Sequence, residues 1–300
     1  MTLISFIVTG RNDNYGGRFI ERMNNFISSI AILSNRHNID SEIVITEWNP
    51  QPEKPFLWQE IYNTNKILKK YKQKIKFIIV PNNIHNTFRN RDDPNRQIPV
   101  LDYAGKNVGI RRSSGQFLLI CSPDLIFQDD FFIKLKNNFF TNKYIYRSAR
   151  TDYHSINLEL DDDNIKYDDF INKCKENSYA VHTEANTPIN NDSDRMYPFP
   201  PFGNASGDFL LTHRDNWLQI QGCPERTDIF SYIDSRVLDK HLAISEQWVL
   251  NLNCSVLHEN HGRFHYTGED EVKIQQLITH INHENWGLNN TQLESISFNY

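Results

Sequence analysis

The sequence predicts an α/β fold with a mostly parallel central sheet flanked by helices. In the first half of the chain, short apolar runs of strand length alternate with longer segments whose apolar residues recur at helical spacing. Strands and helices that alternate in this way form βαβ units, in which neighbouring strands run parallel. The 300 residues, 39 % of them apolar, suffice for one large domain with a sizeable core or for two small ones.

Charge and cysteine content narrow the class of protein. The net charge of −5 and the pI near 6.1 argue against a nucleic-acid or anionic-membrane partner. No apolar run reaches the 18 residues of a membrane span, and the apolar start at 3–8 is too short for a signal peptide. The four cysteines show neither pairing nor metal spacing, so we expect a reduced, cytoplasmic protein.

The first predicted strand, at 3–8, leads into a loop that is a candidate nucleotide-binding element. The loop at 9–17 is rich in glycine and hydrogen-bonding side chains, and helical spacing follows at 18–33. A polar loop between the first strand and the first helix is a usual place to hold a nucleotide. An ordinary Asn/Gly turn is the alternative. The candidate residues are Thr9, Arg11, Asn12 and Asp13.

The second strand, at 42–46, ends in Glu47, where a carboxylate can accept hydrogen bonds from a ribose or a base. A simple capped strand end is equally compatible with this pattern. A helix is predicted over 56–71 and a third strand over 76–80. The polar stretch at 85–99 shows no clear periodicity and predicts a long loop.

The stretch from 100 to 124 is the most informative one. Helical spacing at 100–112 ends near Gly115, which we expect in the left-handed conformation that stops a helix. The unbroken apolar run at 117–121 predicts a central strand covered on both faces. Asp124 follows just past its carboxyl end, where ligands bind in open α/β sheets. A carboxylate there is well placed to hold a divalent cation.

The second half predicts helices at 131–140, 168–179 and 235–243, and strands at 144–147, 209–211 and 247–252. Its acidic stretch at 161–163 is best interpreted as a solvated loop, and the polar segment at 183–197 as a lid. Small residues precede Asp208, and the acids Glu225 and Asp234 follow the helix that carries Trp217. Three histidines then lie close together at 258, 261 and 265, and imidazole is the commonest transition-metal ligand.

These motifs and their order resemble the nucleotide-sugar glycosyltransferases of the GT-A fold, especially the family 2-like ones. The resemblance covers roughly residues 3–265. Those enzymes carry an Asn-x-Gly-x-x-x-small-x-Gly helix, matched from Asn107 to Gly115, and then a strand that ends in an Asp-x-Asp metal motif. Here Asp124 is the last Asp, and Ser122 stands where the first would be.

The resemblance implies a single GT-A-like, Rossmann-like domain over 1–300, with a nucleotide-sugar-binding half at 1–150 and an acceptor-binding, catalytic half at 151–300. It implies a UDP-sugar donor, a glycan or other hydroxyl acceptor, and Mn²⁺ or Mg²⁺ held by Asp124 with His258 or His261. It also implies an inverting reaction with Asp234 as general base and Glu225 in reserve. We expect the helix dipole to keep Asp234 ionised, as a weak base. The implied donor-binding residues are Thr9, Arg11, Asn12, Asp13, Glu47, Asn107 and Arg111, and the implied sugar or acceptor contacts are Asn204, Asp208 and Trp217.

Three alternatives remain open at this stage, and a fourth is argued against by the sequence. Ser122 in place of an Asp favours a non-catalytic nucleotide- or carbohydrate-binding relative of the same fold. Glu225 and Asp234 are also compatible with acids that only complement helix dipoles. A three-histidine zinc site is conceivable, although no helix or fourth ligand supports it. A sugar-nucleotide nucleotidyltransferase would need a Gly-rich loop bearing Arg and Lys after the first strand, and residues 9–17 do not supply one.

Overall fold

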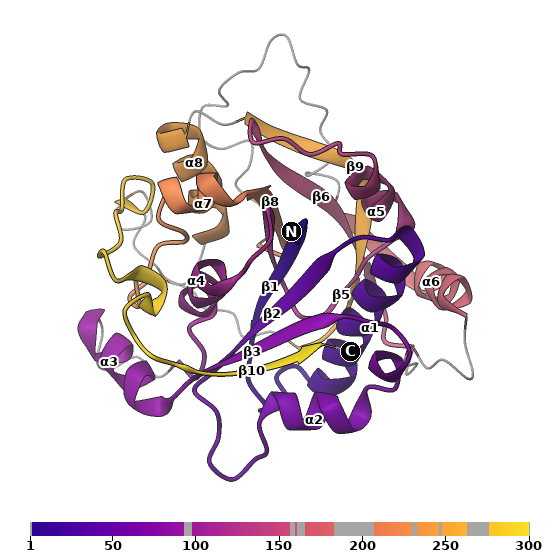
Figure 1. The fold of residues 1–300 in the computed structure, drawn as a ribbon, viewed down its shortest axis with the longest axis horizontal. Helices are drawn as coiled ribbons and strands as arrows, with labels where there is room; N and C mark the ends of the chain where they lie inside the picture. Colours follow the sequence, from indigo (N-terminus) through magenta and orange to yellow (C-terminus); the bar gives the residue numbers. More distant parts are fainter. Residues whose placement is uncertain are drawn as a thin grey trace.

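The structure is a computed structural model that describes residues 2–92, 98–156, 160, 166–182, 207–229, 233–245, 248–262 and 276–299. Within them, ten strands form one sheet in the order β10-β3-β2-β1-β4-β8-β6-β9-β5, with β7 paired to β6 (Figure 1). The strands are β1 (Ile4–Gly10), β2 (Ser41–Trp48), β3 (Lys74–Val80), β4 (Phe117–Cys121), β5 (Leu125–Ile126), β6 (Tyr144–Tyr153), β7 (Ser178–His182), β8 (Phe209–His213), β9 (Trp248–Glu259) and β10 (Glu294–Asn299).

Helices cover both faces of this sheet, as Figure 1 shows. The helices α1 (Phe19–His37), α2 (Leu57–Thr64), α5 (Asp129–Lys136) and α6 (Tyr167–Glu176) pack into one hydrophobic core. The helices α3 (Asn82–Asp92), α4 (Asp102–Arg112), α7 (Arg214–Gln219) and α8 (Ile233–Ser245) pack into a second core on the other face. Short 3₁₀ turns occur at Ile67–Lys69 (η1) and Trp286–Leu288 (η3).

The centre of the sheet is parallel, which confirms the predicted α/β architecture of a central sheet flanked by helices. The pairs β1–β2, β2–β3 and β1–β4 all run parallel. Side chains of β1 alternate between the two cores: Phe6 and Val8 face one, and Ile7 faces the other. Both faces of the strand are therefore buried, which explains why its apolar run is unbroken.

Beyond β4 the sheet becomes mixed, and this change brings the ends of several strands to one edge. Strand β8 runs antiparallel to β4, β6 runs antiparallel to β8, and β9 runs parallel to β6. The carboxyl ends of β1, β4, β6 and β9 therefore meet the start of β8 at the same edge. The predicted strands at 144–147 and 247–252 are correct but too short, because β6 and β9 continue as a ladder to Tyr153 and Glu259.

Three local expectations are wrong. Residues 82–92 are helix α3, because Ile84 and Phe88, four residues apart, pack against the second core. The helix expected over 56–71 breaks at Asn65, whose buried amide donates to the Asn24 carbonyl. Gly115 has no positive φ. It is glycine because a Cβ there would lie 2.5 Å from Ser5 Oγ.

The C-terminal segment adds an unexpected edge strand, since β10 pairs antiparallel with β3. The four cysteines are buried and free. No helix in the described parts of the chain is both long and apolar enough to cross a membrane. The expected lid at 183–197, the acidic stretch at 161–163, Asn204 and His265 lie outside the described residues.

Candidate functional site

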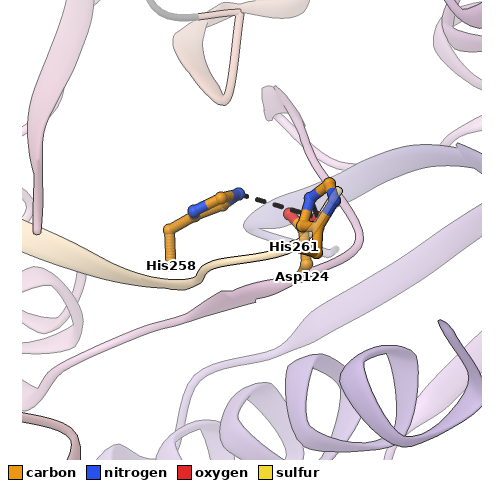
Figure 2. A group of neighbouring side chains, drawn as sticks. All are labelled: Asp124, His258 and His261. Atoms are coloured by element: carbon orange, nitrogen blue, oxygen red, sulfur yellow. Dashed lines mark ion pairs between the residues drawn. The ribbon is translucent and has the colours of Figure 1, made fainter. Parts of the chain in front are cut away.

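Asp124, His258 and His261 form a cluster of possible metal ligands at the edge of the sheet where β4, β6 and β9 end. Asp124 lies between β4 and β5, His258 lies within β9, and His261 follows three residues later. Figure 2 shows the three side chains gathered, with ion-pair contacts from the histidines to Asp124. Their ligand atoms lie within 4.8 Å of one another. The histidines that looked alike in sequence are thus different: His258 is held by a strand, whereas His261 lies on the loop that follows.

The spacing and chemistry of this cluster fit a divalent cation. The Nε2 atoms of His261 and His258 lie 2.9 and 3.8 Å from Asp124 Oδ2. Ligand atoms that share one ion at about 2.1 Å are about 3–3.5 Å apart, close to these separations. The other carboxylate oxygen, Asp124 Oδ1, is buried and accepts no hydrogen bond. Such a buried acceptor is costly unless a ligand satisfies it.

The electrostatics of the cluster keep Asp124 anionic. Burial by itself would raise the pKa of this carboxyl, but His258, His261 and Arg22 outweigh it and lower the pKa. Arg22 is buried in α1, and its Nη1 lies 2.9 Å from Asp124 Oδ2. The same guanidinium donates to the carbonyls of Tyr15 and Gly17. Arg22 therefore ties the loop after β1 to the candidate metal ligand.

A cavity of about 790 Å³ opens beside the cluster. Its walls come from the loop after β1, the start of α4, the segment 122–124, the 224–229 segment and the two histidines. Eight of the predicted site residues line it: Thr9, Arg11, Asp13, Asp124, Asp208, Glu225, His258 and His261. The fold thus gathers residues from both halves of the chain around one space.

Four predicted donor-binding residues do not line this cavity. Asn12 donates to the Pro55 carbonyl, and Arg111 packs over Trp286 and donates to Asn289. Glu47 is fully buried at the end of β2, where its Oε2 accepts from Leu57 N. Burial raises its pKa to about 7.

Asn107 holds the turn that carries Glu225. Its side chain donates to Cys223 O and Glu225 Oε1, and it accepts from Cys223 N. Gly287 N donates to the same Glu225 oxygen, at 2.8 Å. Glu225 therefore both lines the cavity and anchors the chain. Trp217 is fully buried away from the cavity and donates to Leu118 O.

Asp234 lies in the first turn of α8, as predicted, and its carboxylate accepts two backbone hydrogen bonds. Gly207 N donates to Oδ2 at 2.8 Å and Ser235 N donates to Oδ1 at 2.9 Å. Burial outweighs both donors and raises the pKa to about 6. Asp234 is therefore ionised at neutral pH, as expected, but it is a stronger base than the helix dipole alone predicts. It does not line the cavity, whereas the adjacent Ile233 does.

Sequence reasoning missed Arg22, Arg150 and Asp152. Arg150 Nη1 pairs with Asp208 Oδ2, and Ser122 Oγ donates to Asp208 Oδ1 at 2.6 Å. Ser122, which stands where the resemblance expects an Asp, thus holds the carboxylate of Asp208, the residue just before β8. Charged residues inside the strand 144–153 were the available signal for Arg150 and Asp152. No pattern in the helix 19–37 singles out Arg22.

Comparisons with known proteins give fold likenesses only. No protein-family model and no curated protein matches the sequence. The chain is similar to the catalytic domain of Drosophila β1,4-galactosyltransferase 7, solved in complex with xylobiose. The identity is 11 %, the TM-score is 0.45, and the match covers 96 % of this chain and 84 % of that one. It is also similar to residues 1–349 of S. aureus TarS, with 11 % identity, a TM-score of 0.42, and coverage of 86 % of this chain and 60 % of that one.

Proposed function

We propose that this chain is a nucleotide-sugar-dependent glycosyltransferase that uses a divalent cation. The observation that carries the proposal is the Asp124–His258–His261 cluster, which opens on a cavity lined by residues from both halves of the chain. A metal site beside the loop after β1 is an arrangement suited to binding a diphosphate. A UDP-sugar is the donor that the sequence resemblance implies.

The ligand set favours Mn²⁺ over Mg²⁺. Carboxylate ligands suit both ions, but imidazole suits first-row transition metals, and Mg²⁺ is rarely bound by histidine. Two of the three side chains here are histidines. When bound, the cation would neutralise charge on the departing diphosphate.

The remaining chemistry belongs to side chains of this protein. Arg11 lines the cavity, with its Nη1 3.8 Å from Asp13 Oδ2. Its buried Nε has no hydrogen-bond partner, so the guanidinium keeps a donor for a diphosphate oxygen. Asp208, held by Ser122 and Arg150, would orient the hydroxyls of the sugar. The bond from the anomeric carbon to the diphosphate breaks as the acceptor oxygen attacks, and the proton of the acceptor moves to Asp234.

Asp234 suits the role of general base because its pKa is about 6. A general base works best when its pKa is near the working pH, because it is then largely ionised and still basic enough to take a proton. Asp234 accepts from Gly207 N, next to the cavity residue Asp208, and the adjacent Ile233 lines the cavity, so the proton of an acceptor bound there would reach Asp234 through one water. Glu225 is the reserve candidate, although one of its oxygens already accepts two hydrogen bonds.

A donor-hydrolysis screen tests the proposal. Purified protein is incubated with a panel of UDP-sugars and Mn²⁺, and UDP release is measured with and without EDTA. We expect release from at least one donor and its loss in EDTA. Binding of UDP without release from any donor would instead favour a non-catalytic binding protein. With an acceptor in hand, NMR of the product shows whether the anomeric configuration inverts, as a single general base requires.

A further inference from the structure

We infer that Asp152 is a positioning residue for the metal ligand His258, and that Arg150 links this pair to Asp208 in the cavity wall. The inference rests on the metal site of the proposed function and adds the residues that orient it. Asp152 lies near the end of β6, beside β9, which carries His258.

The two nitrogens of the His258 ring face two different carboxylates. Nε2 lies 3.8 Å from Asp124 Oδ2, whereas Nδ1 lies 3.1 Å from Asp152 Oδ1, an ion-pair contact without hydrogen-bond geometry. A neutral imidazole carries one proton, and only its unprotonated nitrogen binds a metal. A carboxylate beside Nδ1 favours the proton on that atom and leaves the Nε2 lone pair for the ion. His258 is almost fully buried, with 3 % of its side chain exposed, so water cannot replace Asp152 easily.

The register between β6 and β9 creates this contact. The ladder pairs Arg147 with Asn251, then shifts before Ala149, which pairs with Ser255. Counted on from the first pair, an unbroken ladder would set Asp152 beside Val256. The shift instead pairs Asp152 with His258. An irregularity of this kind re-aims side chains, and such features are common next to active sites.

Arg150 contacts both oxygens of the Asp152 carboxylate. Its Nε lies 2.8 Å from Asp152 Oδ1, and its Nη2 donates to Oδ2 at 3.2 Å. Its Nη1 contacts Asp208, which lines the cavity. A guanidinium that contacts two carboxylates limits the rotation of both, because its donors are fixed in one plane. The same arginine therefore orients the partner of a metal ligand and a carboxylate that faces the substrate.

A purely structural role predicts something different. If Arg150 and Asp152 were only a buried ion pair, removing the carboxylate would lower stability without changing the histidine. If Asp152 positions His258, its removal changes the proton position on the ring even before a metal is added. The tautomer of His258 thus separates the two roles.

The experiment uses the full chain labelled with ¹⁵N-histidine and free of metal. Long-range ¹H–¹⁵N NMR reports which ring nitrogen carries the proton, and the His258 signal is assigned by its absence in His258→Gln. We expect the Nδ1–H form in the wild type and a mixture of tautomers in Asp152→Asn. Calorimetry with Mn²⁺ alone should then show about 10- to 100-fold weaker binding in Asp152→Asn.

Asp239→Asn is the matched control, because Asp239 also pairs with an arginine, Arg236, at 3.1 Å. That variant should keep the wild-type His258 tautomer and Mn²⁺ affinity. A wild-type His258 protonated on Nε2 overturns the inference, and this measurement needs no variant to fold. Equal tautomers and equal Mn²⁺ affinities in wild type and Asp152→Asn overturn it as well. If the wild type binds no Mn²⁺, the proposed metal site fails, and the tautomer alone then decides the role of Asp152.

Discussion

Asp124 and Asp234 are the same residue type in crowded surroundings, yet their pKa values shift in opposite directions. The pKa of Asp124 is lowered, although burial opposes this, because His258, His261 and Arg22 surround its carboxylate. The pKa of Asp234 is raised to about 6, because burial outweighs its two backbone donors. The nearest charged groups, not the burial itself, make the difference.

The comparison shows how one fold sets the pKa values of two carboxylates apart, in the directions that their two proposed roles need. A carboxyl held anionic by cationic and imidazole neighbours is prepared to bind a metal and would be a poor base. A carboxyl with a pKa near neutrality is prepared to take a proton. Environments that push two pKa values apart in this way are typical of acid–base chemistry in enzymes. Each prediction below tests one side of this contrast.

The largest effect is expected at Asp124. Asp124→Asn removes the charge that the two histidines and Arg22 share, so Mn²⁺ binding measured by calorimetry should weaken by at least ~10²-fold, more than loss of an outer partner does. Asp129→Asn is the control, because Asp129 pairs with Arg36 and His37 at the surface of another helix. Wild-type Mn²⁺ affinity in Asp124→Asn would remove Asp124 from the metal site.

The second-largest effect is expected at Asp234, the proposed general base. Asp234→Asn keeps the shape of the side chain but removes its basicity, so sugar transfer should fall by ~10²-fold or more while UDP affinity is kept. In the wild type, kcat/KM should fall as the pH drops through about 6, since Asp234 must be ionised to accept a proton. Near-wild-type transfer by Asp234→Asn would eliminate it as the base, and Glu225→Gln would then be the variant to measure.

Two adjacent glycines allow a test of how the loop after β1 supports the candidate metal ligand His261. Gly16 and Gly17 have φ values of +68° and +79°, so alanine at either position costs about 1 kcal/mol of backbone strain. A Cβ on Gly16 would lie 2.5 Å from His261 Nδ1, whereas a Cβ on Gly17 meets nothing within 4 Å. Gly16→Ala should therefore weaken Mn²⁺ binding on the order of tenfold, and Gly17→Ala should leave it unchanged. Equal affinities in the two variants would show that the loop does not support His261.

The smallest effect tests, on a third carboxylate, whether burial without neighbouring positive charges raises the pKa of a carboxyl. Glu47 accepts a hydrogen bond from Leu57 N, but burial outweighs this donor and raises the pKa of the carboxyl to about 7. Because the folded-state pKa exceeds the unfolded one, the stabilising contribution of protonated Glu47 is complete below the unfolded value. It is lost as the pH rises through about 7. Between pH 5 and pH 8 the free energy of unfolding of the wild type should therefore fall by roughly 1–3 kcal/mol relative to Glu47→Gln.

Urea unfolding of both proteins at the two pH values measures this difference. The amide of Glu47→Gln keeps an oxygen for Leu57 N, so the variant isolates the charge. Parallel pH dependence in both proteins would show that Glu47 titrates normally. The explanation given for the pKa values of Asp124 and Asp234 would then not apply to Glu47.

Much of the site was predictable where local pattern decides the structure. The apolar run before Asp124 has the length and composition of a buried strand. The carboxylate was therefore expected just after the end of that strand. The same reasoning placed the polar loop after β1 and the first turn of α8 correctly. It failed for α3, because two apolar side chains in a very polar segment are too weak a signal until Trp48 and the second core are known to lie beside them.

The sequence by itself determined the α/β alternation, the parallel centre of the sheet and the position of Asp124 at its edge. Only the tertiary structure decided which residues meet there. Arg22 lies 102 positions from Asp124, and Asp152 lies beside His258 only through the shifted β6–β9 register. Such contacts depend on strand order and register, which depend on the packing of the whole sheet. The opposite pKa shifts of Asp124 and Asp234 follow from the tertiary surroundings of each, because a pKa depends on what surrounds a side chain and not on its place in the chain.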